Sequence, residues 1–127
     1  MESGTKAIQK ITVEEKDTAI AYGSGTLPVF ATPAMIALME NTAMNVVSAE
    51  LAEGEATVGT LINVKHLSAT PVGCTVDCEA ELTEIDGRRL VFKVTASDSK
   101  GLIGEGVHER FIVKTEKFLA KAQDKLS

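Results

Sequence analysis

The longest apolar stretch of the chain lies between residues 32 and 50, where hydrophobic side chains recur with helical spacing. Thr32 is a suitable N-cap, Pro33 suits the first helical position, and Gly54 follows shortly after the end. The pattern therefore predicts one helix of about five turns. Because this helix is apolar around most of its circumference, other elements must wrap around it.

One carboxylate, that of Glu40, interrupts the apolar surface of the predicted helix. Its neighbours at helical spacing carry neither a charge nor a polar group: Pro33, Ile36, Ala37, Ala43, Met44 and Val47. A carboxylate in apolar surroundings is unfavourable unless something compensates it. Glu40 is therefore either a rim residue paired with a Lys or Arg, or a general base or nucleophile facing a cavity.

Outside this helix, hydrophobic and polar positions alternate, which is the period of a strand. Alternation predicts strands over residues 7–13, 57–67, 74–85, 90–96 and 102–113. A loop with Gly and Pro at 23–28 leads into the helix. Asp86-Gly87 predicts a two-residue hairpin of type I′. Residues 114–126 predict an amphipathic final helix with most lysines on one side.

This order of elements, one strand, a long helix, four antiparallel strands and a final helix, favours the α+β hot-dog fold, in which a sheet curls around one central helix. Residues 1–127 are expected to form a single domain. A single sheet leaves exposed edges, so we expect a homodimer paired edge to edge, with a dimer of dimers as a further option.

Composition narrows the range of partners. The chain is 44% apolar and 24% charged, which is ordinary for a globular protein. A net charge of -5 argues against nucleic-acid binding but leaves room for an anionic small molecule in a local basic patch. Without an apolar leader or a membrane-spanning run, we expect a cytoplasmic protein that does not bind membranes. Cys74 and Cys78 would lie about 13 Å apart on one strand, so we expect reduced thiols and no metal site.

His66 and Thr32 are the next candidates for chemistry. In a regular strand His66 continues the inward register of Val58, Ile62 and Val64, and would face the central helix. It is then either a satisfied core histidine or the partner of a carboxylate on that helix. The Thr32 hydroxyl is either a simple cap or a donor to an oxyanion at the helix N-terminus.

The distance between the candidates limits how they could act together. A helical rise predicts that Thr32 and Glu40 lie roughly 12 Å apart. Acting on one substrate would require a long substrate, a bent loop or a second subunit. Gly59 is either a bulge or an N–H donor to an oxyanion. His108 and Arg110 alternate with their neighbours on the last strand, and we interpret them as surface or sheet-pairing residues.

Six short motifs follow one another in a fixed order from Val29 to the final helix. They are Val29-Phe30-Ala31-Thr32, Leu38-Met39-Glu40, Val58-Gly59-Thr60, the eight residues 66–73, Asp86-Gly87-Arg88-Arg89-Leu90 and the six residues 106–111. Their order and spacing resemble the small hot-dog acyl-CoA thioesterases similar to fluoroacetyl-CoA thioesterase. The resemblance implies that the family's catalytic threonine, glutamate and histidine fall on Thr32, Glu40 and His66, and its oxyanion glycine on Gly59.

The segment before Val29 departs from that family. The fluoroacetyl-specific enzyme carries a longer segment with aromatic residues that gate the pocket, whereas here the segment is the shorter run from Ala21 to Pro28. The resemblance therefore implies a thioesterase for a short or small acyl-CoA, without the gate that goes with fluoroacetyl specificity.

We therefore expect hydrolysis of an acyl-CoA to the free acid and CoA, without metal or organic cofactor. Glu40 would activate water or attack the carbonyl to form an anhydride, and His66 would position and shuttle the proton. Thr32 and the Gly59 N–H would stabilise the carbonyl oxygen. The basic candidates for the CoA phosphates are Lys65, Arg88, Arg89 and, less directly, the lysines of the final helix.

Two alternatives remain open at the level of sequence. The first is a non-catalytic acyl-CoA-binding or regulatory hot-dog module, in which Glu40 and His66 only line a pocket. The second is a hydratase on the same fold, which is less favoured because no Asp and His pair occurs at close helical spacing.

Overall fold

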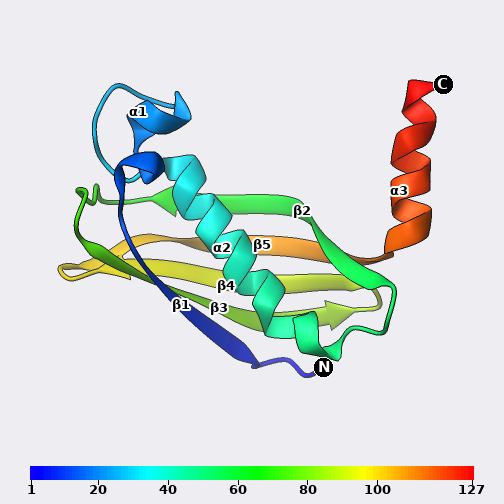
Figure 1. Cartoon of the computed structure of the whole chain (residues 1–127). Helices are drawn as coiled ribbons and strands as arrows, with labels where there is room; N and C mark the ends of the chain where they lie inside the picture. Colours follow the sequence, from blue (N-terminus) through cyan, green and yellow to red (C-terminus); the bar gives the residue numbers. More distant parts are fainter.

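A five-stranded antiparallel sheet curls around one long helix in the computed structural model, which describes residues 1–127 (Figure 1). Its strands are β1 (Lys6–Thr12), β2 (Glu55–His66), β3 (Thr75–Asp86), β4 (Arg89–Asp98) and β5 (Gly101–Lys114), in the spatial order β1-β3-β4-β5-β2. The five predicted strands are thus confirmed to within two residues at each end. The arrangement is the hot-dog fold expected from the sequence.

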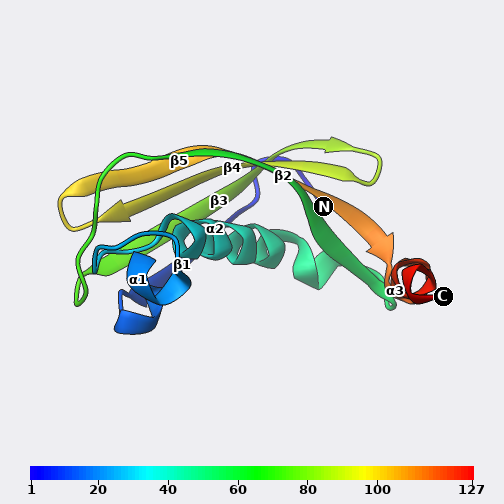
Figure 2. The same ribbon diagram turned by 90° about the horizontal axis from the view of Figure 1, so that it is seen from above.

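Helix α2 (Thr32–Val47) lies along the inner face of the sheet (Figure 2). It continues into a 3-10 turn, Ser48–Glu50, so the predicted helix is confirmed in extent while its last turn is tighter. Met35 on α2 is fully buried, and a Cβ on Gly104 of β5 would lie 2.5 Å from the Met35 sulfur. Glycine at this position therefore allows α2 to pack close to the sheet.

Strand β2 contains a bulge that changes which side chains face the helix. Its register with β5 passes from Gly59 directly to Leu61 and leaves Thr60 as an extra residue. Gly59 therefore turns to the inner face, and Val58 turns to the outer face. The prediction that Val58 points inward is wrong because it assumed a regular strand.

The β3–β4 hairpin has a two-residue loop, but one position later than predicted. Asp86 pairs with Arg89, so the loop consists of Gly87 and Arg88. Of these two loop residues only Gly87 has a positive φ, at 61°. A positive φ at the first loop residue alone corresponds to a type II′ turn instead of the predicted type I′.

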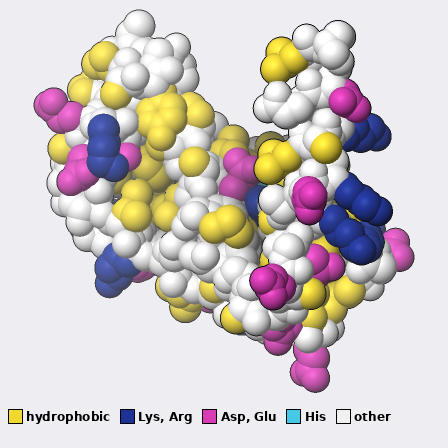
Figure 3. All heavy atoms as spheres, turned by 45° about the vertical axis from the view of Figure 1, so that its right-hand side comes forward, with side chains coloured by type: hydrophobic (Ala, Val, Ile, Leu, Met, Phe, Trp, Pro, Cys, Tyr) yellow, Lys and Arg dark blue, Asp and Glu magenta, His cyan; other side chains and the backbone are white.

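Two short helices extend past the β2 edge at opposite ends of the molecule. Helix α1 (Ala19–Tyr22) follows a 3-10 turn, Glu15–Asp17, in a region where the sequence predicted only loop. Helix α3 (Thr115–Gln123) continues as a 3-10 turn, Asp124–Leu126, and has no buried residue. A hollow separates the two ends, and hydrophobic side chains of the α3 arm border it (Figure 3). No helix in the structure has the length and apolar character needed to cross a bilayer.

Candidate active site

The first residue of α2 and the last residue of β2 meet at one end of the fold. The Oγ1 of Thr32 lies 2.7 Å from Nδ1 of His66. The ring of Phe30 packs edge-on against the His66 imidazole, with centroids 6.5 Å apart. The N-cap of α2 is Ala31 and no side chain caps the helix, so the prediction of Thr32 as N-cap is wrong. Its hydroxyl is bonded to His66 instead.

The imidazole of His66 is held neutral with one nitrogen unused. Burial lowers the pKa of His66 below its usual range, which favours the neutral ring. The Thr32 hydroxyl donates to Nδ1 if the ring proton is on Nε2, and accepts if it is on Nδ1. In either tautomer Nε2 is buried and has no partner within the chain. The chain itself covers Nε2, so a ligand would reach this pair from the side of the exposed Thr32.

A pocket of about 340 Å³ opens beside this pair. Its lining comes from the α1 end, the start of α2 and the segment after β2: Ala19, Ser24, Val29, Phe30, Thr32, His66, Leu67, Ser68 and Ala69. The lining includes no carboxylate. The segment before Val29 contributes Ser24 to this lining, and its role as a gate stays a prediction.

Glu40 lies two turns further along α2, against the bulge of β2. A Cβ on Gly59 would lie 2.8 Å from Oε2 of Glu40, 3.3 Å from Cε1 of His108 and 3.5 Å from Nη1 of Arg110. The half-buried carboxylate therefore packs directly on the backbone, which only glycine permits. Glu40 makes no hydrogen bond or ion pair within the chain and is left available for other groups.

His108 and Arg110 belong to this second cluster. They pair within the sheet, opposite Ile62 and Gly59 of β2, but the prediction that they lie at the surface is wrong. They are only 1% and 6% exposed. Arg110 donates from Nε to Oγ1 of Thr57 at 2.9 Å and from Nη2 to the Thr57 carbonyl at 2.8 Å. The only signal in the sequence was their alternate spacing in phase with Ile112, which does not reveal the face of the sheet.

The protonation of His108 follows from its neighbours. Nη1 of Arg110 lies 3.2 Å from Nε2 of His108, and because a guanidinium can only donate, Nε2 accepts. The Nδ1–H of His108 then donates to the carbonyl of Leu61 at 2.8 Å. Burial is the main cause that lowers the pKa of His108, and the charge of Arg110 adds to it. His108 is therefore a neutral support that orients the guanidinium next to Glu40.

One chain thus brings the candidate residues together as two separate groups. Thr32 and His66 form the first, while Glu40 and Gly59 form the second. The predicted facing pair of Glu40 and His66 does not form within one chain. The reason is geometric, because His66 is at the end of β2 beside the start of α2, whereas Glu40 is opposite the bulge near the middle of β2.

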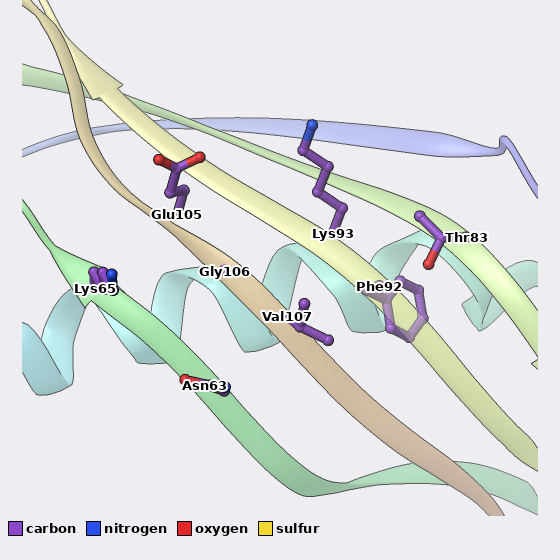
Figure 4. A pocket seen from close by; sticks show the side chains of 8 residues that line it. All are labelled: Asn63, Lys65, Thr83, Phe92, Lys93, Glu105, Gly106 and Val107. Atoms are coloured by element: carbon purple, nitrogen blue, oxygen red, sulfur yellow. The ribbon is translucent and has the colours of Figure 1, made fainter.

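The three strand and hairpin cations proposed for CoA lie in different surroundings. Arg89 is bound by both carboxylate oxygens of Glu109, at 2.8 and 3.1 Å, and by Glu84 at 3.0 Å. Lys65 lies with Lys93 and Glu105 around a pocket on the outer side of the sheet, away from α2 (Figure 4). Arg88, in the hairpin loop, lines a different pocket together with α3.

The fold and these residues define a thioesterase of the hot-dog class, and comparison with known proteins gives the family. A family described as fluoroacetyl-CoA-specific thioesterase matches residues 13–116. The fluoroacetyl-CoA thioesterase of Streptantibioticus cattleyicolor is 45% identical over 97 residues, which span 76% of this chain and 70% of that protein. The chain therefore belongs to the fluoroacetyl-CoA-specific thioesterase family.

Solved structures agree with this assignment. The fluoroacetyl-CoA thioesterase FlK is 37% identical, with a TM-score of 0.94 over 98% of this chain and 97% of that one. A threonine-to-serine mutant of FlK in complex with acetyl-CoA is 35% identical, with a TM-score of 0.95 over 100% of both chains. A thioesterase superfamily member from Thermus thermophilus is 27% identical, with a TM-score of 0.89 over 97% of this chain and 91% of that one. The resemblance seen in the sequence is thereby confirmed.

Proposed function

We propose that this chain hydrolyses the thioester of a short acyl-CoA to the free acid and CoA. The observation that carries the proposal is the side-chain geometry. At the start of α2, Thr32 forms a hydrogen bond with His66 of β2, and near the middle of α2 the Glu40 carboxylate is free. These are the groups that acid–base or nucleophilic attack on a thioester needs. The FlK mutant structures with acetyl-CoA, or with fluoroacetate and CoA, support the same class of substrate.

We propose further that two copies of the chain build each site. Strand β2 is an edge of the sheet, with Leu61 and Ile62 45% and 38% exposed. Antiparallel pairing of two β2 strands would continue the sheet and cover these side chains. In such a pair His66, at the end of one strand, would lie opposite the middle of the partner strand, beside the partner's Gly59 and Glu40. The Thr32–His66 pair would then face Glu40 of the partner subunit across one substrate.

The two helices that extend past the β2 edge support this homodimer. The strand pairing places α3 of one subunit beside α1 of the other, because the two helices mark opposite ends of β2 (Figure 1). The apolar side chains Leu119 of α3 and Leu126 of the 3-10 turn after it are exposed and would be covered there. A dimer of dimers, a cytoplasmic location and a single domain over residues 1–127 stay predictions of the sequence.

In the proposed reaction Glu40 takes a proton from water while the water oxygen bonds to the thioester carbon. The Thr32 hydroxyl and the Gly59 N–H stabilise the resulting oxyanion, and the positive charge of Arg110 lies nearby. The C–S bond then breaks, and the proton that Glu40 took from water passes through the Thr32–His66 pair to the departing CoA sulfur. Direct attack by Glu40 to give an anhydride, followed by its hydrolysis, uses the same groups.

The test of activity is thiol release from a panel of short, aromatic and long acyl-CoAs, with Glu40→Gln as the matched variant. We expect turnover of short acyl-CoAs by the wild type and its loss in the variant. Tight acyl-CoA binding without thiol release from any member of the panel would instead support the non-catalytic binding module.

The test of the shared site mixes two inactive variants, Glu40→Gln and His66→Ala. In a mixed dimer with shared sites, one site carries both substitutions and the other carries neither. Refolding the two variants together in equal amounts should therefore restore about a quarter of the wild-type activity. Sites contained within single chains would give no recovery, because every site would then carry one substitution.

A further inference from the structure

A separate pocket lies at the far end of the sheet, between the β3–β4 hairpin loop, the end of β5 and α3. Its volume is about 480 Å³. Four of its eight lining residues are cations and none is acidic: Arg88, Lys114, Lys117 and Lys121 stand beside Phe111, Ile112, Val113 and Phe118. The whole chain has 13 basic residues and a net charge of -5. The pocket therefore concentrates charge of the sign opposite to that of the protein.

None of these four cations forms an ion pair in the structure, although Lys114 and Lys117 also border a second pocket that contains Glu53, Glu55 and Glu116. The ion pairs of the structure use other lysines and arginines, and the contact of the Arg88 guanidinium is a 3.5 Å bond from Nη1 to the carbonyl of Ile112. The adjacent Arg89, by contrast, is bound by Glu109 and Glu84. Four like charges around one cavity repel one another, so an anion that binds there is favoured.

Two aromatic rings complete the lining of this pocket. Phe111 and Phe118 are 39% and 44% exposed and come from different elements, β5 and α3. Cations bind phosphate oxygens, and exposed rings stack against a base. Inorganic phosphate would use only the cations, whereas a nucleotide with several phosphates uses both kinds of side chain.

We propose that this pocket binds the 3′-phosphoadenosine diphosphate end of the acyl-CoA substrate. The proposal rests on the proposed function, which supplies CoA as the ligand. Strand β5 connects the two places, because Arg110 lies beside Glu40 and Lys114 follows four residues later, roughly 13 Å along the strand. The flexible pantetheine arm of CoA would join the thioester to the nucleotide around the end of the sheet. The pocket around Lys65 fits less well because it contains the carboxylate of Glu105.

The decisive variant is the double charge reversal Lys117→Glu with Lys121→Glu on the exposed side of α3. The matched control is Lys10→Glu with Lys100→Glu, two exposed lysines elsewhere. Each replacement removes one positive charge and adds one negative charge, so both variants change the net charge from -5 to -9. We expect the α3 variant to raise KM for acyl-CoA about tenfold at unchanged kcat, and the control to change KM about twofold or less. Size-exclusion chromatography confirms that both variants keep the oligomeric state of the wild type.

Two further measurements separate this proposal from the proposed function. The α3 variant should hydrolyse the corresponding acyl-pantetheine, which lacks the nucleotide, with wild-type KM and kcat. Calorimetry should show that adenosine 3′,5′-bisphosphate binds the wild type and the control but binds the α3 variant at least tenfold more weakly. Phe118→Ala should weaken binding of the bisphosphate more than binding of pyrophosphate, because only the former has a base to stack.

Other results would disprove the nucleotide site without disproving the proposed thioesterase activity. If the wild type does not bind the bisphosphate, or if the control loses as much affinity as the α3 variant, the pocket is not the nucleotide site. Turnover of acyl-pantetheine would still report the proposed function in that case. If neither thioester is hydrolysed while the bisphosphate binds as described, the proposed function fails and the nucleotide site stands.

Discussion

The two groups on α2 are held in different ways. At the helix start, Thr32 and His66 come from distant parts of the chain and are positioned by one 2.7 Å hydrogen bond between their side chains. At the middle of the helix, Glu40 makes no such bond and is positioned by shape, because it fills the space that a Cβ on Gly59 would occupy. Activity should therefore fall when the Thr32 hydroxyl of the first group is removed. In the second group it should fall when a side chain at position 59 takes the space of the Glu40 carboxylate.

The largest effect should come from removing the charge in the middle of the helix. Glu40→Gln keeps the size of the side chain and removes its basicity, so kcat/KM should fall about a thousandfold. Thiol release measures this loss, and circular dichroism should show an unchanged fold because Glu40 has no partner within the chain. If more than a tenth of the activity remained, Glu40 would be neither base nor nucleophile.

The next effect should come from filling the space beside the carboxylate. Gly59→Ala places a Cβ 2.8 Å from Oε2 of Glu40, so the carboxylate must move. Because Oε2 is the far end of a flexible side chain, stability should fall by only about 1 kcal/mol, whereas kcat/KM should fall about a hundredfold. Steady-state kinetics and urea unfolding measure the two quantities.

A second glycine provides the control for this effect of shape. Gly104→Ala directs its Cβ at the fully buried Met35 sulfur, 2.5 Å away, and at the Lys65 carbonyl, 3.1 Å away. It should reduce stability by about 2 kcal/mol because the core cannot relax freely. If Gly59→Ala were the more destabilising of the two, the close packing of Glu40 would be structural and not functional.

The next effect concerns the helix start and should separate capping from chemistry. Thr32→Ala removes the bond to His66 and should lower kcat/KM about thirtyfold, while Thr32→Ser should stay within about threefold of the wild type. Because the N-cap is Ala31, Thr32→Ala should not cost the roughly 1 kcal/mol that loss of a capping side chain costs. Full activity of Thr32→Ala with reduced stability would restore the capping role and remove the chemical one.

The comparison also shows what a sequence can reveal about such a site. Helical periodicity identified Glu40, because a carboxylate in an apolar pattern is visible within one element. It could not identify Arg110 or His108, since alternation along β5 does not reveal which set of side chains faces α2. The bulge at Thr60 likewise concealed that Gly59 faces Glu40, because alternation does not predict bulges. The bond between Thr32 and His66 spans 34 positions, so it depends on the assembled fold, and only the family resemblance linked the two residues.

The smallest effect should come from lowering the pH. It distinguishes the two groups because each contains one histidine, His66 in the first and His108 in the second. Burial lowers the pKa of both His66 and His108, so each folded pKa lies below the unfolded value of about 6.5. The stability that the neutral rings provide is fully present above pH 6.5 and is lost as the pH falls through the folded pKa. The unfolding free energy, measured in urea, should therefore decline in the wild type below pH 6.5.

His108→Asn separates stability from activity in this acid range. Asparagine keeps a donor for the Leu61 carbonyl but cannot titrate, so the variant should lose less stability between pH 7.5 and 5.5 than the wild type does. The acid limb of kcat/KM should stay at the same pH in this variant, because His66 at the other end of the site sets it. If the acid limb moved or vanished in His108→Asn, protonation of His108 beside the Arg110 guanidinium would control the activity. The proton-transfer role would then belong to the group around Glu40 and not to His66.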